Sequence, residues 1–145
     1  MLRLKRIAAA LLLPLLLVLG SSGTALAGAE CAKSAFVGTW NVLYNWDGPS
    51  GIGSGKMSVC FRSDGTFSSY DTEGAGAGCS TGGIRYSGTW NYSPQFGTIS
   101  FIYSAPATAR YYATSSSCAN GGAAMAGTMT NGTSGGTFNA VRFFP

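Results

Sequence analysis

The sequence contains no histidine among its 145 residues, and only 10% of its residues are charged. Histidine is the usual general base of enzymes near neutral pH and the commonest metal ligand in proteins. Its absence excludes a Ser-His-Asp triad, a cysteine nucleophile activated by histidine and a metal site built on imidazole groups. We therefore expect no catalytic residues, no bound metal and no cofactor, and we predict that the protein is not an enzyme.

Two other motifs that carry chemistry are incomplete. Lys56 follows a glycine-rich stretch like that of a phosphate-binding loop, but Ser50 and Met57 stand where that loop requires glycine and serine or threonine. Asp71 and Glu73 lie two residues apart beside a glycine-rich turn, where carboxylates are usually solvated. Neither motif supports a nucleotide-binding or catalytic function.

Long apolar runs are confined to the N-terminus. Three basic residues precede an apolar run over residues 7–18, and Ala25-Leu26-Ala27 supplies the small residues of a cleavage site. These features predict a secretory signal peptide over residues 1–27. A signal-anchor helix is the alternative, but the apolar run is short for a membrane span. We expect cleavage, no stable membrane anchor afterwards, and a secreted or periplasmic protein.

The basic charge of the chain belongs largely to this leader. The formal net charge is +4 for the whole chain, whereas residues 28–145 contain six basic and five acidic residues, a net charge of +1. The remaining basic residues form no cluster, so electrostatics does not support a nucleic-acid partner. The expected partner is a small hydrophobic ligand or another protein.

A Gly-Thr pair followed by a large apolar residue occurs six times, at 38–40, 65–67, 88–90, 97–99, 127–129 and 136–138. Glycine permits bends, threonine favours strands and the third residue offers a large side chain to bury. Apolar alternation and turn residues predict eight strands, at about 36–45, 56–62, 66–72, 84–92, 97–103, 108–115, 123–130 and 136–143. Asn131-Gly132 predicts a hairpin between the last two strands.

Short connections between consecutive strands favour an antiparallel meander, and closing the sheet removes its exposed edges. The sequence therefore predicts an all-β fold with one domain over residues 28–145. We expect an eight-stranded antiparallel up-and-down barrel, stapled by two disulfides. Alternation along the first strand places Phe36, Gly38, Trp40, Val42 and Tyr44 on its inward face.

All four cysteines lie in the exported part, an even count that predicts two disulfides. Their wide spacing and the absence of histidine argue against zinc. Three pairings are possible. Cys31 precedes the first strand and Cys118 joins strands six and seven, so both belong to one end of the barrel. This topology favours Cys31–Cys118 and leaves Cys60–Cys79, where a long loop would fold back over the second strand.

Gly38-Thr39-Trp40 on the first strand resembles the G-x-W motif of the calycin superfamily, which contains lipocalins, fatty-acid-binding proteins and avidins. In lipocalins this tryptophan lies near the closed end of the barrel, and an arginine from a late strand packs across it. The resemblance implies a structural role for Gly38 and Trp40, with Arg142 on the last strand as the partner of the indole.

Eight strands give a barrel interior that side chains can fill or that can hold a small ligand. If a cavity exists, its mouth is expected where residues 46–55, 73–83, 104–107 and 131–135 connect the strands. We predict that a small apolar or aromatic ligand would contact aromatic side chains with polar tips, namely Tyr44, Trp46, Tyr86, Trp90 and Tyr103.

Two alternatives to ligand binding stay open. The first is a protein-binding barrel, because small periplasmic inhibitors of metalloproteases resemble this layout, with G-x-W on an early strand. The second is a stable exported or envelope protein whose aromatic side chains fill the interior.

Overall fold

The computed structural model describes residues 31–48, 53–70, 79, 86–118 and 123–143, so the predicted signal peptide lies outside the described residues. A short helix, α1 (Lys33–Phe36), precedes eight strands. These are β1 (Gly38–Asp47), β2 (Ser54–Phe61), β3 (Thr66–Tyr70), β4 (Tyr86–Ser93), β5 (Thr98–Tyr103), β6 (Arg110–Ser117), β7 (Ala124–Thr130) and β8 (Gly135–Arg142). No helix of the described residues is long and apolar enough to cross a membrane.

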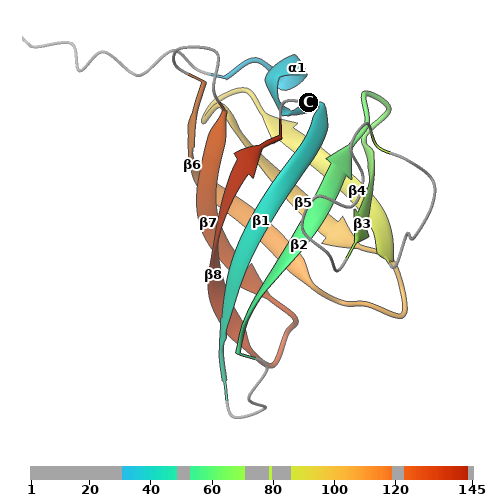
Figure 1. Cartoon of the computed structure of the whole chain (residues 1–145), viewed down its shortest axis with the longest axis vertical. Helices are drawn as coiled ribbons and strands as arrows, with labels where there is room; N and C mark the ends of the chain where they lie inside the picture. The colour runs from blue at the N-terminus through green and yellow to red at the C-terminus, as the bar shows by residue number, and fades with distance from the viewer. Residues whose placement is uncertain (1–30, 49–52, 71–78, 80–85, 119–122, 144–145) are drawn as a thin grey trace, which may run out of the picture.

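Each strand pairs antiparallel with the next, and β8 returns to pair with β1, which closes the barrel (Figure 1). The predicted fold class is therefore confirmed. The β7–β8 hairpin also forms as predicted, and the Asn131 side chain accepts hydrogen bonds from the backbone of Thr133 and Ser134 within its turn. Alternation and turn chemistry are local signals, which explains why they identified the eight strands, although several observed bounds differ from the predicted ones by one or two residues.

The start of the first strand differs from the prediction. Phe36 lies in α1 rather than in a strand, and β1 begins at Gly38, whose φ is +128°. Glycine adopts this conformation without the steric cost that a side chain would add, so the chain turns there from helix to strand. At its other end β1 continues to Asp47, which places Trp46 on the strand instead of in the following loop.

The six Gly-Thr pairs explain much of the packing. The third residue of each of the six copies is buried, with exposures of 0–2% for Trp40, Phe67, Trp90, Ile99, Met129 and Phe138. Some of the glycines occupy turns with positive φ, as Gly38 does, and others allow close approach within the sheet. A Cβ on Gly88 would collide with the carbonyl oxygen of Ile102 and lie 2.6 Å from the Phe67 ring.

Aromatic rings fill the middle of the barrel. Phe61 and Phe67 each contact Phe101 edge-on, with centroids 5.1 and 5.4 Å away. Tyr111 stacks on the same Phe101 ring at 4.4 Å with an interplanar angle of 7°. The inward face predicted for Trp40 is confirmed, since this residue is 0% exposed, and Trp90 on β4 is also buried, at 2%. Much of the interior is therefore packed core rather than a channel.

Both predicted disulfides are present. Cys31 is bonded to Cys118, which ties the segment before α1 to the residue that follows β6. Cys60 on β2 is bonded to Cys79. The topological argument succeeded because strand order alone decides at which end of a meander each connection lies.

Candidate functional site

One end of the barrel is closed by α1 (Figure 1). The Trp40 indole N–H donates to the carbonyl oxygen of Phe36 at 2.8 Å. The Arg142 guanidinium donates to the carbonyl oxygens of Ala35 at 3.2 Å and Val37 at 2.7 Å. These bonds satisfy three consecutive carbonyl groups where the helix ends, a place where backbone acceptors lack helical partners.

Gly38, Trp40 and Arg142, which the resemblance grouped, are neighbours in the structure. Trp40 and Arg142 are directly opposite each other on β1 and β8. A Cβ on Gly38 would lie 3.2 Å from Nη2 of Arg142, so glycine leaves room for the guanidinium. The resemblance implied that this group packs against the indole face. In the structure it donates hydrogen bonds to backbone carbonyl groups.

Trp90 also belongs to the closed half of the barrel. Its indole N–H donates to the carbonyl oxygen of Arg62 at 2.8 Å, in the turn between β2 and β3. The ammonium of Lys33 in α1 lies 5.4 Å from the centre of its ring, within the range of a cation–π interaction. The structure therefore separates Trp90 from the other four residues predicted to contact a ligand, and its contacts assign it to the core.

The opposite end of the barrel holds a cavity of about 290 Å³. It is bordered by the end of β1 and by the residues that join β5 to β6 and β7 to β8, two of the connections predicted for the mouth. Of the other two predicted connections, residues 49–52 and all of 73–83 except Cys79 lie outside the described residues. Four of the five predicted ligand residues line it together. The described residues that line it are Tyr44, Trp46, Met57, Ser69, Tyr86, Tyr103, Pro106, Ala107, Thr108, Ala109, Tyr111 and Asn131.

Among the described residues that line this mouth cavity, none is aspartate, glutamate, lysine or arginine. Its polar groups are neutral hydroxyls, an amide and an indole N–H, set among aromatic and aliphatic surfaces. The Tyr103 hydroxyl donates to Sδ of Met57 at 3.1 Å. An apolar pocket with a few polar groups is the usual form of a site for small organic molecules.

Tyr111 is the main lining residue that the sequence did not single out. It is 3% exposed, and its pKa is raised by burial and, to a lesser degree, by the neighbouring Tyr103 and Tyr44. Its hydroxyl therefore stays protonated at neutral pH. Alternation on β6 places Tyr111 on one face with Ala109 and Ala113. The adjacent Tyr112 puts a tyrosine on the other face as well, so alternation does not indicate which of the two faces points inward.

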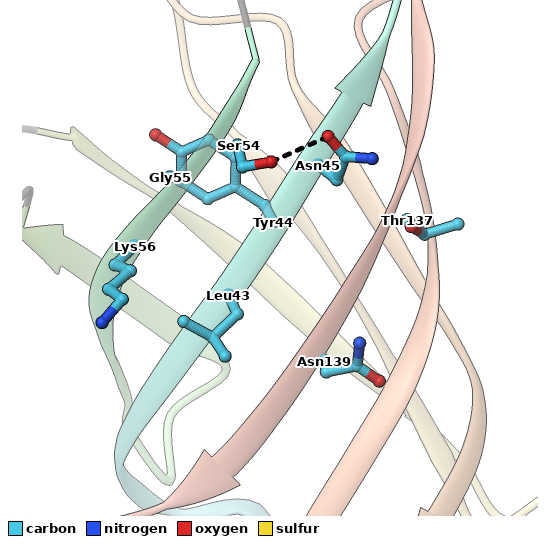
Figure 2. Close-up of a pocket in the computed structure, with 8 residues that line it drawn as sticks. All are labelled: Leu43, Tyr44, Asn45, Ser54, Gly55, Lys56, Thr137 and Asn139. Atoms are coloured by element: carbon cyan, nitrogen blue, oxygen red, sulfur yellow. Dashed lines mark hydrogen bonds between the residues drawn. The ribbon is translucent and has the colours of Figure 1, made fainter.

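A second depression, of about 370 Å³, lies on the outer surface of the barrel across β1, β2 and β8. Figure 2 shows its side chains, including Leu43, Lys56 and Asn139, and the hydrogen bond from Ser54 to Asn45 of 3.0 Å. It is larger than the mouth cavity, but it lies between outward-pointing side chains rather than inside the barrel. Tyr44 borders both because its ring lies against Gly55.

Comparison of the chain with family models, curated proteins and solved structures found no match. The fold and the site therefore define the class of this protein. It is a small, disulfide-linked, closed β-barrel that has a packed core, a helix across one end and an aromatic cavity at the other.

Proposed function

We propose that this protein binds a small apolar or aromatic molecule in the mouth cavity of its barrel and that it acts by binding rather than by catalysis. One observation carries the proposal: Tyr44, Trp46, Tyr86 and Tyr103 come from three different strands and converge on one cavity, whose described lining residues are all uncharged. Its volume of about 290 Å³ is near the lower end of the range for ligand pockets. The proposed ligand is therefore small.

We further propose that the barrel is calycin-like. The support is the combination of G-x-W at the start of β1, a helix across that end and an arginine on the last strand that binds the helix carbonyls. Export to the periplasm or the medium is part of the same proposal. It is supported by two disulfides, which persist in oxidising compartments, and by the predicted leader.

A neutral dye that fluoresces in apolar surroundings, N-phenyl-1-naphthylamine, tests the binding function. We expect saturable enhancement of its fluorescence by the wild-type protein. Ala107→Phe adds a phenyl group to the lining of the cavity and is expected to weaken binding at least about tenfold, which is 1.4 kcal/mol. Ala124→Phe, at an exposed position on β7, is the matched control and should leave binding unchanged.

The proposal fails if the dye does not bind saturably, or if both alanine variants bind it as well as the wild-type protein. Circular dichroism of each variant should accompany the titration, because a misfolded barrel would also lose binding. If no other small aromatic compound displaced the bound dye, the result would likewise contradict a single pocket for molecules of this kind.

A protein-binding barrel is the second candidate, and exposed apolar residues on the outer surface favour it. Leu43 on β1 is 49% exposed and Val141 on β8 is 56% exposed. The pairing of Leu43 with Asn139 and of Asn41 with Val141 makes these two residues diagonal neighbours. A metalloprotease inhibition assay tests this candidate. Inhibition that Leu43→Asp abolishes and Ala107→Phe preserves would replace ligand binding with this function.

A further inference from the structure

The Tyr111 ring is fixed on three sides within the barrel. It stacks on Phe101 at 4.4 Å, contacts Phe138 at 5.4 Å and lies 5.9 Å from Tyr103. The residue is 3% exposed and still lines the mouth cavity. Its position is therefore set by the packed core beneath the cavity, and a ligand would meet a side chain that is already ordered.

The Tyr111 hydroxyl has no hydrogen-bond partner within the part of the chain that the structure describes. Among those residues, no fully buried side-chain nitrogen or oxygen lacks a partner. The Tyr111 oxygen must therefore retain some accessible surface, and for a residue buried to this extent that surface is the cavity. Tyr103 differs, because its hydroxyl proton is directed to Sδ of Met57.

The described lining of the cavity carries no charge. None of its residues is acidic or basic, and burial raises the pKa of Tyr111, so its hydroxyl remains a neutral donor. An ionised ligand would lose its hydration there without gaining a counter-ion, which is strongly unfavourable. A neutral acceptor such as a carbonyl oxygen would instead accept a hydrogen bond from the Tyr111 hydroxyl. This bond would replace the one that the ligand's oxygen makes with water.

From these observations we infer that the mouth cavity selects small, neutral, flat molecules that carry a hydrogen-bond acceptor, typified by an aromatic ketone, and that the Tyr111 hydroxyl donates to that acceptor. This inference rests on the proposed function, and it adds the chemical class of the ligand and the residue that recognises it.

Three probes of nearly equal shape separate the effect of a hydrogen-bond acceptor from the effect of charge on binding. Acetophenone has a carbonyl acceptor, ethylbenzene has none, and benzoate is charged. Their binding at pH 7 can be followed by NMR through the amide of Tyr111 and the indole N–H of Trp46. One neutral hydrogen bond corresponds to about three- to tenfold in affinity. We expect acetophenone to bind tighter than ethylbenzene by that factor and benzoate to bind weakest.

Tyr111→Phe removes the hydroxyl and keeps the ring, so it should abolish the advantage of acetophenone over ethylbenzene. Tyr112→Phe removes a hydroxyl from a residue that is 40% exposed on the same strand, and it should preserve the advantage. The carbonyl stretch of bound 13C-labelled acetophenone gives a second readout on the wild-type protein. A shift to lower frequency than in hexane is expected, whether or not the phenylalanine variant folds.

The inference is overturned if acetophenone and ethylbenzene bind equally, if Tyr111→Phe retains the difference, if the carbonyl stretch is unshifted or if benzoate binds best. In each of these cases binding at the cavity, and with it the proposed function, still stands. If none of the three probes shifts the Tyr111 and Trp46 signals, and the dye also fails to bind, both proposals fail together.

Discussion

Trp40 and Arg142 are opposite each other on β1 and β8, and together they bind the three consecutive carbonyl groups of Ala35, Phe36 and Val37. Two side chains that are about a hundred residues apart in sequence thus hold one helical turn across the end of the barrel. The helix is only four residues long, too short to be stable without such contacts. The closed end is therefore a product of tertiary hydrogen bonds.

Replacing Trp40 by alanine should lower the free energy of unfolding by about 3–5 kcal/mol, since the indole is fully buried and also binds the helix. Urea denaturation followed by circular dichroism measures this change. Leu43→Ala, on the outward face of the same strand, is the control and should cost about 0.5 kcal/mol or less. A Trp40→Ala protein as stable as the wild type would contradict the assigned inward face.

Arg142→Met should lower the free energy of unfolding by about 2–3 kcal/mol, because it leaves the carbonyl groups of Ala35 and Val37 without their charged donor. Arg110→Met removes an exposed guanidinium from β6 and should change stability by about 0.5 kcal/mol at most. Equal effects of the two substitutions would show that the helix contacts do not stabilise the closed end.

The two disulfides should contribute unequally. Loop-closure entropy predicts about 4–5 kcal/mol for Cys31–Cys118, which spans 87 residues, and about 3 kcal/mol for Cys60–Cys79, which spans 19. Double serine variants of each pair, compared by thermal unfolding under oxidising conditions, test this order. A larger loss from the Cys60–Cys79 pair would mean that packing around the buried Cys60, rather than chain entropy, determines the effect.

Gly88→Ala should destabilise the barrel by about 1–3 kcal/mol, because the added methyl group would collide with β5 and with the Phe67 ring. Thr89→Ala changes the next residue, which points outward, and should have a small effect. Urea denaturation of both variants gives the comparison. If Gly88→Ala were neutral, close approach of the strands would not be the reason for glycine at this position.

Alkaline pH should weaken the fold in part through Tyr111. Its pKa is raised by burial in the folded state, whereas in the unfolded chain a tyrosine ionises near pH 10, so the stability that it contributes is complete below about pH 10 and falls above it. At pH 11 this loss is about 1.4 kcal/mol. Unfolding of the wild-type protein and of Tyr111→Phe at pH 8 and pH 11 measures it. Identical losses in the two proteins would exclude Tyr111 as a source.

The sequence predicted most residues of the candidate site but not how far along the barrel each of them lies. Alternation correctly placed Tyr44 on the inward face of the first strand, yet it could not tell that Tyr44 lies at the mouth and that Trp90, predicted to contact the same ligand, lies at the closed end. That distinction depends on the register between strands, which pairs Tyr44 with Gly55 and Trp90 with Phe101. Tyr111 was missed because Tyr111 and Tyr112 give β6 two faces of similar composition.

By itself, the amino-acid sequence determined the eight strands and their meander order, because alternation and turn residues are properties of neighbouring residues, and that order favoured one of the three possible cysteine pairings. Only the tertiary structure decided that α1 covers one end, that Arg142 binds its carbonyl groups and that Tyr111 lies beneath a cavity of about 290 Å³ whose described lining carries no charge. These features join residues distant in sequence, and the space left between them depends on how all the side chains pack at once.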